Sequence, residues 1–308
     1  MQTILITGGT GLVGKKLSSL LVAKGYHIII LTRNPDRKED SKNISYAAWD
    51  PSKGSIDIQS VKKANYIIHL AGAPVMEKRW TTAYKNEIAE SRIKSSLLIA
   101  ETLKNTSHQV QAIISSSAIG WYGADKEENN VFVETDPAAP DFLGQTCLQW
   151  ERSIEKAEQG NVRVCKLRTG IVLDDKGGAL EEFIKPLKFG VATILGNGSQ
   201  MISWIHIDDL CNMFHHLLIN NVSGSFNAVS PEPVTNKKLV LTLAKLMKGE
   251  FYIPMHVPVP LLKLVLGERS IEVLKSATVS AKKILDSSFR FHYPDIGTAL
   301  SEITKRIN

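Results

Sequence analysis

The feature that most constrains the fold is a turn with regularly spaced glycines near the N-terminus. Ile4 to Ile6 is a short apolar run rich in β-branched residues, which predicts a buried first strand. Gly8, Gly11 and Gly14 follow, and the run from 12 to 21 has the apolar spacing of a helix. Such glycines allow a tight turn, the approach of a pyrophosphate, and close packing of helix on strand. The helix directs its N–H groups at the phosphates. We therefore expect a dinucleotide site made by Gly8, Thr10, Gly11, Leu12, Val13 and Gly14.

Strand and helix patterns alternate through the first half of the chain. Apolar runs at 27–31, 44–49, 66–70, 111–115 and 162–168 are typical of strands, with helical spacing between several of them. This alternation predicts an α/β fold with a doubly wound parallel sheet.

The pattern changes at Thr169, where glycine-rich loops and short segments begin. We assign 1–168 to a nucleotide-binding domain, with elements of 200–230 returning to it. The remainder, 169–308, is expected to form a smaller, mostly helical substrate lobe that includes a small C-terminal domain at 250–308. Within this lobe, Asp208 is expected to cap a helix over 209–218.

The residue after the second strand selects between the two nicotinamide dinucleotides. An acidic residue there binds the ribose 2′-OH of NAD, whereas an arginine accommodates the 2′-phosphate of NADP. The chain has Arg33 at this place, and the guanidinium fork suits a phosphate. An exposed loop arginine without a ligand is the structural alternative, but the position relative to the glycine turn favours NADP(H). After the fourth strand, Leu70, Ala71 and Gly72 let a nucleotide lie against the backbone.

A run of hydroxyls follows the predicted strand at 111–115. Ser115, Ser116 and Ser117 are expected just beyond the strand end, over the cofactor crevice. Hydroxyls there are placed for substrate binding or proton transfer. A hydroxyl-rich turn is the alternative.

Composition excludes several classes of protein. The 308 residues are 43% hydrophobic and 22% charged, as in a globular protein, and no apolar run approaches the roughly 18 residues of a membrane span. The 37 basic residues are dispersed, so the net charge of +6 does not predict a nucleic-acid partner. Three scattered cysteines lack metal-site spacing and indicate a reducing, cytoplasmic location. We expect no metal and no membrane partner, and a monomer or homodimer.

Together these segments resemble the short-chain dehydrogenase/reductase superfamily, on its extended or atypical branch. The turn at 7–14, the His69–Ala73 segment, the serines at 115–117 and the segment 204–209 are similar to motifs of that branch. A closer resemblance is to the epimerase-like family with a small C-terminal domain of unknown function. It rests on the pairs or runs at 79–80, 91–92, 118–123, 141–143, 150–151 and 291–294. The resemblance implies a Rossmann-type sheet and a nicotinamide cofactor.

One departure from that superfamily concerns catalysis. Its active members are expected to carry a tyrosine, and a lysine four residues later, in the helix after the serine motif. Residues 142–151 of this chain contain no such pair. Tyr122 and Lys126 have the spacing, but they lie in a polar loop where that spacing has no helical meaning. Ser117 is the best placed hydroxyl for proton transfer, and Tyr122 is the next.

Five further residues are candidates for ligand contacts, and each has a structural alternative. Arg92 is expected to face the cofactor and bind a phosphate or an anionic substrate, or to be a solvated helix residue. Arg168 is expected to contact substrate or to pair with a carboxylate. Arg79 and Trp80 are expected to cover the ligand or to pack between lobes. His206 is a substrate candidate or a structural histidine near a helix start.

Two functions follow from these expectations. The first is an NADP(H)-dependent oxidoreductase or epimerase-like enzyme acting on a small, anionic substrate. The second is a catalytically silent NADP(H)-binding sensor or regulatory protein, which the missing tyrosine–lysine pair favours.

Overall fold

A large parallel sheet forms the frame of the protein. The computed structural model describes residues 1–127 and 130–307. Eight strands lie in the order β12-β7-β6-β5-β1-β2-β3-β4, and all are parallel to their neighbours except β4, which is antiparallel to β3. The strands are β1 (Thr3–Thr7), β2 (His27–Thr32), β3 (Ile44–Asp50), β4 (Ser55–Ile56), β5 (Tyr66–His69), β6 (Ala112–Ala118), β7 (Arg163–Thr169) and β12 (Gly224–Ala228).

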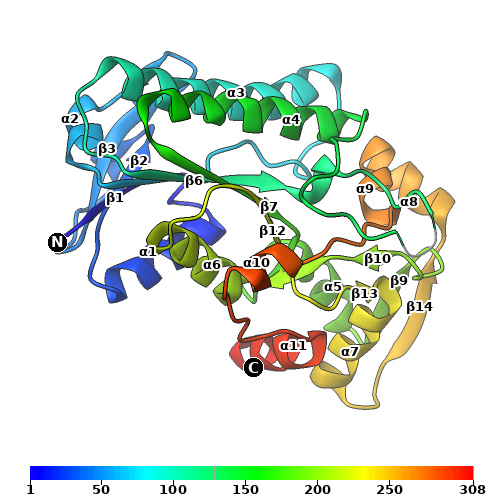
Figure 1. The fold of residues 1–308 in the computed structure, drawn as a ribbon. Coiled ribbons are helices and arrows are strands. Elements are labelled where there is room, and N and C mark those ends of the chain that lie inside the picture. The colour runs from blue at the N-terminus through cyan, green and yellow to red at the C-terminus, as the bar shows by residue number, and fades with distance from the viewer. Residues whose placement is uncertain (128–129, 308) are drawn as a thin grey trace.

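Helices cover both faces of this sheet, which is the doubly wound α/β arrangement predicted from the sequence (Figure 1). Side chains alternate along the strands, so Ile4, Ile68 and Ile114 face one layer, whereas Leu5 and Ile113 face the other. The helices that cover the sheet are α1 (Leu12–Ala23) and α6 (Ile207–Ile219) on the first face, and α2 (Ile58–Lys63), α3 (Thr82–Asn105) and α4 (Phe142–Glu155) on the second. Both faces are therefore buried, as parallel sheets require.

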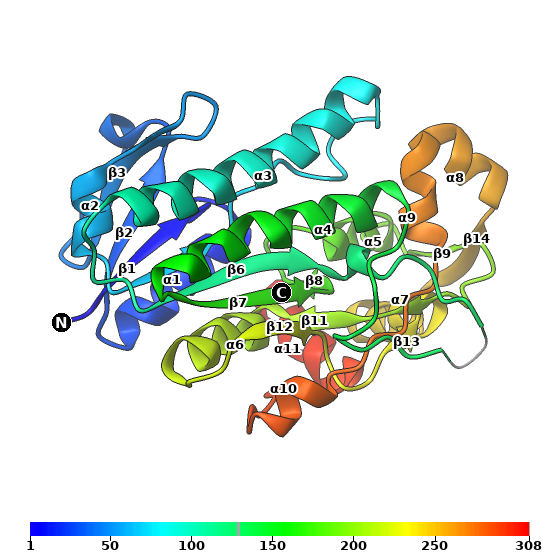
Figure 2. The same ribbon diagram turned by 45° about the horizontal axis from the view of Figure 1, so that its top comes forward.

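The second half of the chain builds a smaller lobe and then returns to the sheet. Its short strands pair as β8 (Ile171–Leu173) with β11 (Trp204–His206), β10 (Met201–Ile202) with β13 (Val234–Thr235), and β9 (Val191–Leu195) with β14 (Ile253–Val257). Its helices are α5 (Ala179–Leu187), α7 (Asn236–Lys248), α8 (Val259–Leu266), α9 (Ser270–Leu274), α10 (Lys282–Asp286) and α11 (Ile296–Ile307). Figure 2 shows β9, β14 and α8 beyond the end of β6, toward which the β6 arrow points. The lobe thus lies off the carboxyl ends of the strands, where parallel sheets bind ligands.

Three sequence expectations need correction. Strand β6 continues to Ala118, so Ser115 to Ser117 lie within the strand and not beyond it. His206, not Asp208, caps α6: its ring nitrogen Nδ1 accepts the Asp208 N–H at 3.1 Å. The C-terminal segment also contains a strand, β14, which the prolines of that region concealed. In the described part of the chain, no helix is both long and apolar enough to cross a membrane.

Candidate functional site

The glycine turn between β1 and α1 has the geometry that a phosphate site needs. Gly8 has φ +69°, and a Cβ there would lie 2.9 Å from the carbonyl carbon of Leu70. A Cβ on Gly14 would lie 2.6 Å from the Cα of Gly9 and would also overlap the Gly8 oxygen. Gly11 has more room, since its Cβ would approach the Gly8 oxygen only to 3.4 Å. Close contacts with the protein backbone therefore require glycine at positions 8 and 14. Gly11 is less restricted and leaves space on the ligand side.

Thr10, Leu12 and Val13 complete this turn. Gly11 is the N-cap of α1 and receives no side-chain cap, so the first N–H groups of the helix remain available to an anion. Thr10 is exposed, and Leu12 and Val13 are half-buried at the start of the helix. These residues lie where a pyrophosphate would meet the helix N-terminus.

A buried hydrogen-bond relay joins this turn to the one after β5. Thr7 Oγ1 lies 2.7 Å from His69 Nδ1 and accepts the N–H groups of Leu70 and Ala71 at 3.2 and 3.3 Å. Because that oxygen accepts two N–H groups, its own proton goes to Nδ1, and the Nε2–H of His69 faces two serine hydroxyls of α3. Burial lowers the pKa of His69 to about 3, so the ring is neutral. The relay fixes Leu70, Ala71 and Gly72 against the glycine turn, and its role was not predicted.

Arg33 follows β2 directly, at the carboxyl edge of the strand next to β1. Leu31 pairs with Thr7, the last residue of β1, so Arg33 lies two residues beyond that level, on the side of the glycine turn. Its side chain is exposed and forms no ion pair with a described residue. This guanidinium is therefore free to meet a ligand on the β2 side of the turn.

Arg92 projects from α3 beneath the turn that follows β5. A Cβ on Gly72 would lie 3.1 Å from the guanidinium carbon of Arg92. Its Nη1 donates to the carbonyls of Ala73 and Ile88 at 3.0 and 2.9 Å, and the guanidinium lies 5.0 Å from the ring centre of Trp150. Arg92 thus lies beside the turn after β5, and its contact with a cofactor stays a prediction.

Ser117 is held by a carboxylate that the sequence analysis did not select. Its hydroxyl donates to Glu151 Oε1 at 2.6 Å. Arg168 binds the same carboxylate through Nε at 2.9 Å and Nη2 at 3.0 Å. The structural alternative given for Arg168, pairing with a carboxylate, is thus what the fold contains. The sequence did contain an indication that Glu151 is buried, because helical spacing places it on the same face of α4 as Cys147 and Ile154.

Tyr122 belongs to the same buried network. Its hydroxyl donates to Asn227 Oδ1 at 2.6 Å and accepts from Arg168 Nη1 at 3.1 Å. Burial raises the pKa of Tyr122 to about 12. Lys126 is exposed while Tyr122 is buried, so their spacing does not make them a pair. Ser115 lies in the same strand as Ser117 but does not join this network; its hydroxyl donates to the carbonyl of Ser116 at 3.0 Å.

Helix α4 contains no tyrosine–lysine pair, as its sequence shows. Leu143 and Cys147 are the side chains that a Cβ on Gly120 would meet, at 3.3 and 3.9 Å. Cys147 donates to the Ala118 carbonyl at 3.7 Å, at the end of β6. Burial raises the pKa of this thiol to about 12, so it is neutral. The helix therefore presents an apolar residue and a protonated thiol at this edge.

Arg79 contacts the smaller lobe, whereas Trp80 packs within the large domain. Arg79 Nη2 donates to the carbonyl of Leu264 in α8 at 3.3 Å. The Trp80 indole donates to the Val75 carbonyl at 2.8 Å, and its ring meets Phe142 edge-on at 5.2 Å. Packing between lobes, the alternative given for these residues, therefore describes the Arg79 contact, while these Trp80 contacts stay within 1–168.

His206 has a structural position at the start of α6. Its ring is fully buried, lies 3.9 Å from the ring of Tyr293 centre to centre, and caps the helix as described above. Burial lowers the pKa of His206. Asp208 instead forms ion pairs with Lys16 and Arg306, each at 2.8 Å. The helix-start role of His206 given as the alternative is thus present.

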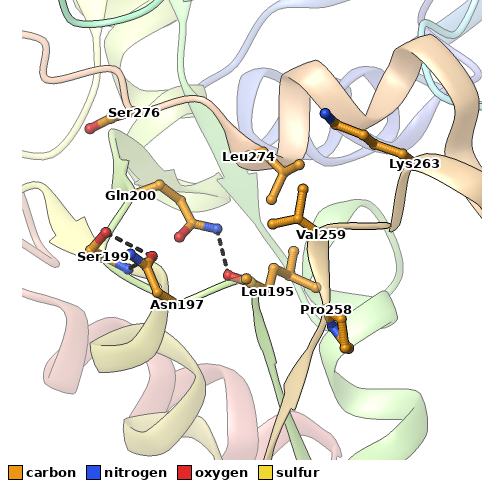
Figure 3. A pocket seen from close by; sticks show the side chains of 10 residues that line it. Leu195, Asn197, Ser199, Gln200, Pro258, Val259, Lys263, Leu274 and Ser276 are labelled. Carbon is orange, nitrogen blue, oxygen red and sulfur yellow. Dashed lines mark hydrogen bonds between the residues drawn. The ribbon is translucent and has the colours of Figure 1, made fainter. Parts of the chain in front are cut away.

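A cavity of about 710 Å³ lies in the smaller lobe, between the turn after β9 and the start of α8. Figure 3 shows Gln200 donating to the Leu195 carbonyl, at 3.2 Å, and Asn197 facing Ser199. Lys263 supplies a positive charge, and the lining is otherwise uncharged: Leu195, Gly196, Asn197, Ser199, Gln200, Pro258, Val259, Leu274 and Ser276. The glycines at 196 and 198 belong to the loops that were expected after Thr169, and no cavity was predicted there. Asn197, an amide side chain between these two glycines, is the sequence feature that could have indicated the cavity.

Comparisons with known proteins place the chain in a family. The model of the NAD dependent epimerase/dehydratase family matches residues 4–228, and a domain of unknown function, DUF1731, matches residues 257–303. The epimerase family protein YfhF of Bacillus subtilis is 34% identical over 304 residues, 98% of each chain.

Two solved structures extend this likeness. The human epimerase family protein SDR39U1, crystallised with NADPH, superposes with a TM-score of 0.85 at 25% identity and covers 99% of both chains. A nucleoside-diphosphate sugar epimerase from Corynebacterium glutamicum gives 0.77 at 29% identity, over 98% of this chain and 58% of its own. The resemblance read from the sequence is confirmed: the chain belongs to the NAD-dependent epimerase/dehydratase family and carries a small C-terminal domain of unknown function.

Proposed function

We propose that this protein is an NADP(H)-dependent oxidoreductase or epimerase-like enzyme that acts on a small, anionic substrate. The observation that carries the proposal is the glycine turn, whose Gly8 and Gly14 have no room for a Cβ and whose helix N-terminus is uncapped. That cradle fits the pyrophosphate of a dinucleotide. The NADPH in the human relative's structure supports the same cofactor.

Arg33 favours NADP(H) over NAD(H) in this proposal. The adenosine end of a dinucleotide lies on the β2 side of the turn, where the exposed Arg33 has no carboxylate partner among the described residues. Its fork would bind the 2′-phosphate. Leu70, Ala71, Gly72 and the α1 start would line the rest of the cofactor, with Thr7 and His69 fixing their positions.

The proposed proton route uses Ser117. When bound, the nicotinamide supplies hydride chemistry, and the protein orients the substrate and moves a proton. Ser117 already donates its hydroxyl hydrogen to Glu151, so it would accept a substrate proton as its own passes to the carboxylate. Tyr122 is the second candidate hydroxyl. The cavity beside Lys263 is the proposed position for the remainder of the substrate.

A catalytically silent NADP(H)-binding sensor is the second candidate. The missing tyrosine–lysine pair in residues 142–151 favours it, because α4 then lacks the proton donor that active members of the superfamily are expected to use. Both candidate hydroxyls also lie within a satisfied hydrogen-bond network.

Cofactor choice is tested by Arg33→Ala, with the exposed Arg152 of α4 as a control in Arg152→Ala. A charge-assisted contact to phosphate contributes about 1.5–3 kcal/mol. Since Arg33 is exposed, we expect the low end, a loss of about tenfold in NADPH affinity, with little change for NADH. The control should leave both affinities unchanged. Equal losses for the two dinucleotides would refute the 2′-phosphate assignment.

Turnover separates the two functions. NADPH absorbance is followed with a broad panel of carbonyl compounds, and sugar nucleotides are tested by product analysis, because epimerisation leaves the oxidation state of the cofactor unchanged. Turnover that is lost in Ser117→Ala contradicts the sensor. A bound cofactor with no turnover across the panel contradicts the enzyme.

A further inference from the structure

Arg92 carries a charge that the protein itself does not neutralise. Its side chain is only partly exposed, and no carboxylate among the described residues lies within ion-pair distance of it. Two carbonyl oxygens satisfy Nη1, while Nε and Nη2 donate to no described residue. Burial lowers the pKa of this guanidinium, which shows how weakly its surroundings compensate it.

Two other arginines that are buried or half-buried differ from Arg92. Arg168 is bound through two nitrogens to Glu151. Arg163 donates to the carbonyls of Leu217, Leu218 and Val222 near the end of α6, at 2.7 to 2.9 Å. Both are satisfied by the fold. The half-buried Arg92 retains a free edge with two donor groups.

The position of Arg92 places that edge near the reacting end of the cofactor. The pyrophosphate site lies at β1, and Arg33 marks the adenosine side, over β2. Since β5 and β6 are the next strands on the opposite side of β1, the nicotinamide half must lie over them. Arg92 touches Gly72 and Ala73 after β5 and packs on Trp150 of α4.

A carboxylate is the ligand group that best matches this edge. The two donors of a guanidinium edge bind the two oxygens of a carboxylate in parallel. Unlike the exposed Arg33, Arg92 is half-buried, so solvent would not compensate the second charge of a phosphate dianion there, and the neighbouring Arg168 is already neutralised by Glu151. The adjacent Cys147 is neutral. A single uncompensated charge therefore fits a monoanion.

We infer that the free edge of the Arg92 guanidinium binds a carboxylate of the substrate beside the nicotinamide, which makes the substrate class a carboxylic acid. This inference rests on the proposed function. It assigns to α3 the task of orienting the substrate, and it predicts that uncharged analogues bind poorly.

The test uses the NADPH-loaded protein and a panel of small 2-oxo and 2-hydroxy monocarboxylic acids, each paired with its neutral amide. Binding is followed by quenching of NADPH fluorescence. We compare the wild type with Arg92→Gln, with Arg92→Lys, which keeps the charge, and with Lys94→Gln, an exposed control on the same helix. At least one acid should bind tenfold more tightly than its amide in the wild type and in the control. That preference should disappear in Arg92→Gln and persist in part in Arg92→Lys.

Two results would overturn the inference without refuting NADPH binding. No acid binding better than its amide in the wild type would exclude a carboxylate site. A parallel fall in NADPH affinity in Arg92→Gln would assign the charge to the cofactor. Failure of the wild type to bind NADPH at all would instead refute the proposed function. Thermal unfolding of each variant excludes misfolding as the cause.

Discussion

Replacing Glu151 by glutamine tests whether the buried network stabilises the fold. Glu151 and Arg168 are each 3% exposed, and their bidentate contacts measure 2.9 and 3.0 Å. Glu151→Gln preserves the shape of the side chain but leaves the Arg168 charge buried without a counter-ion. Removing one partner of a buried pair destabilises a protein by about 3–5 kcal/mol.

The expected shift in melting temperature follows from chain length. Unfolding entropy is about 2.1 cal/mol/K per residue, or roughly 0.65 kcal/mol/K for this chain of 308 residues. A loss of about 4 kcal/mol therefore lowers Tm by about 6 °C. Urea unfolding followed by circular dichroism measures the free energy directly.

An exposed ion pair on α3 supplies the control. Glu90 pairs with Lys94, and their side chains are 58% and 54% exposed, so Glu90→Gln should lose no more than about 1 kcal/mol. Combining Glu151→Leu with Arg168→Met removes both buried charges and should recover part of the loss. A Glu151→Gln variant as stable as the control would refute the claim that the buried Arg168 charge depends on Glu151 as its counter-ion.

Further predictions concern the glycine turn and the histidine relay. Gly14→Ala should lower both Tm and NADPH affinity, because its Cβ has no room, whereas Gly11→Ala should leave Tm within about 2 °C and weaken only NADPH binding; equal effects on Tm would contradict the distinction. His69 has a pKa of about 3 in the fold, below its ordinary value. Below about pH 6.5 the unfolded chain therefore binds more protons than the folded one, and the free energy of unfolding decreases as the pH is lowered. Between pH 7 and pH 5 the wild type should lose about 2 kcal/mol more than His69→Gln in urea unfolding. Identical losses would show that His69 is not held neutral.

Local patterns were sufficient to predict the frame of the fold. The β-branched runs and the glycine spacing fixed β1, α1 and their turn, because each signal lies within about 20 consecutive residues. The alternation of strands and helices likewise predicted the doubly wound sheet. The position of Arg33 after β2 followed from the same order of elements.

The contacts inside the site depend on residues far apart in the sequence. Glu151 reaches Arg168 and Ser225 from different elements, and no local period predicts which charges a fold will bring together. The serines at 115–117 were placed beyond the strand because the predicted strand ended at Ser115. Pairing with β7 keeps them in the strand through Ala118. The sequence likewise suggested Asp208 as the cap of α6, but His206 fills this role. The Asp208 carboxylate instead forms ion pairs with Lys16 and Arg306.

The two arginines on this face of the sheet show how structural and ligand-binding charges can be told apart. Arg168 was a substrate candidate in the sequence, but every polar partner it needs is supplied by the fold, so its charge is neutralised before any ligand arrives. Arg92 could be a solvated helix residue by sequence alone, yet it lies partly buried beside Gly72 with donors unused. A charge is expensive to bury without a partner. The incomplete site is therefore the one that calls for a ligand, and our inference assigns recognition of an anion to α3 and not to the network around Glu151.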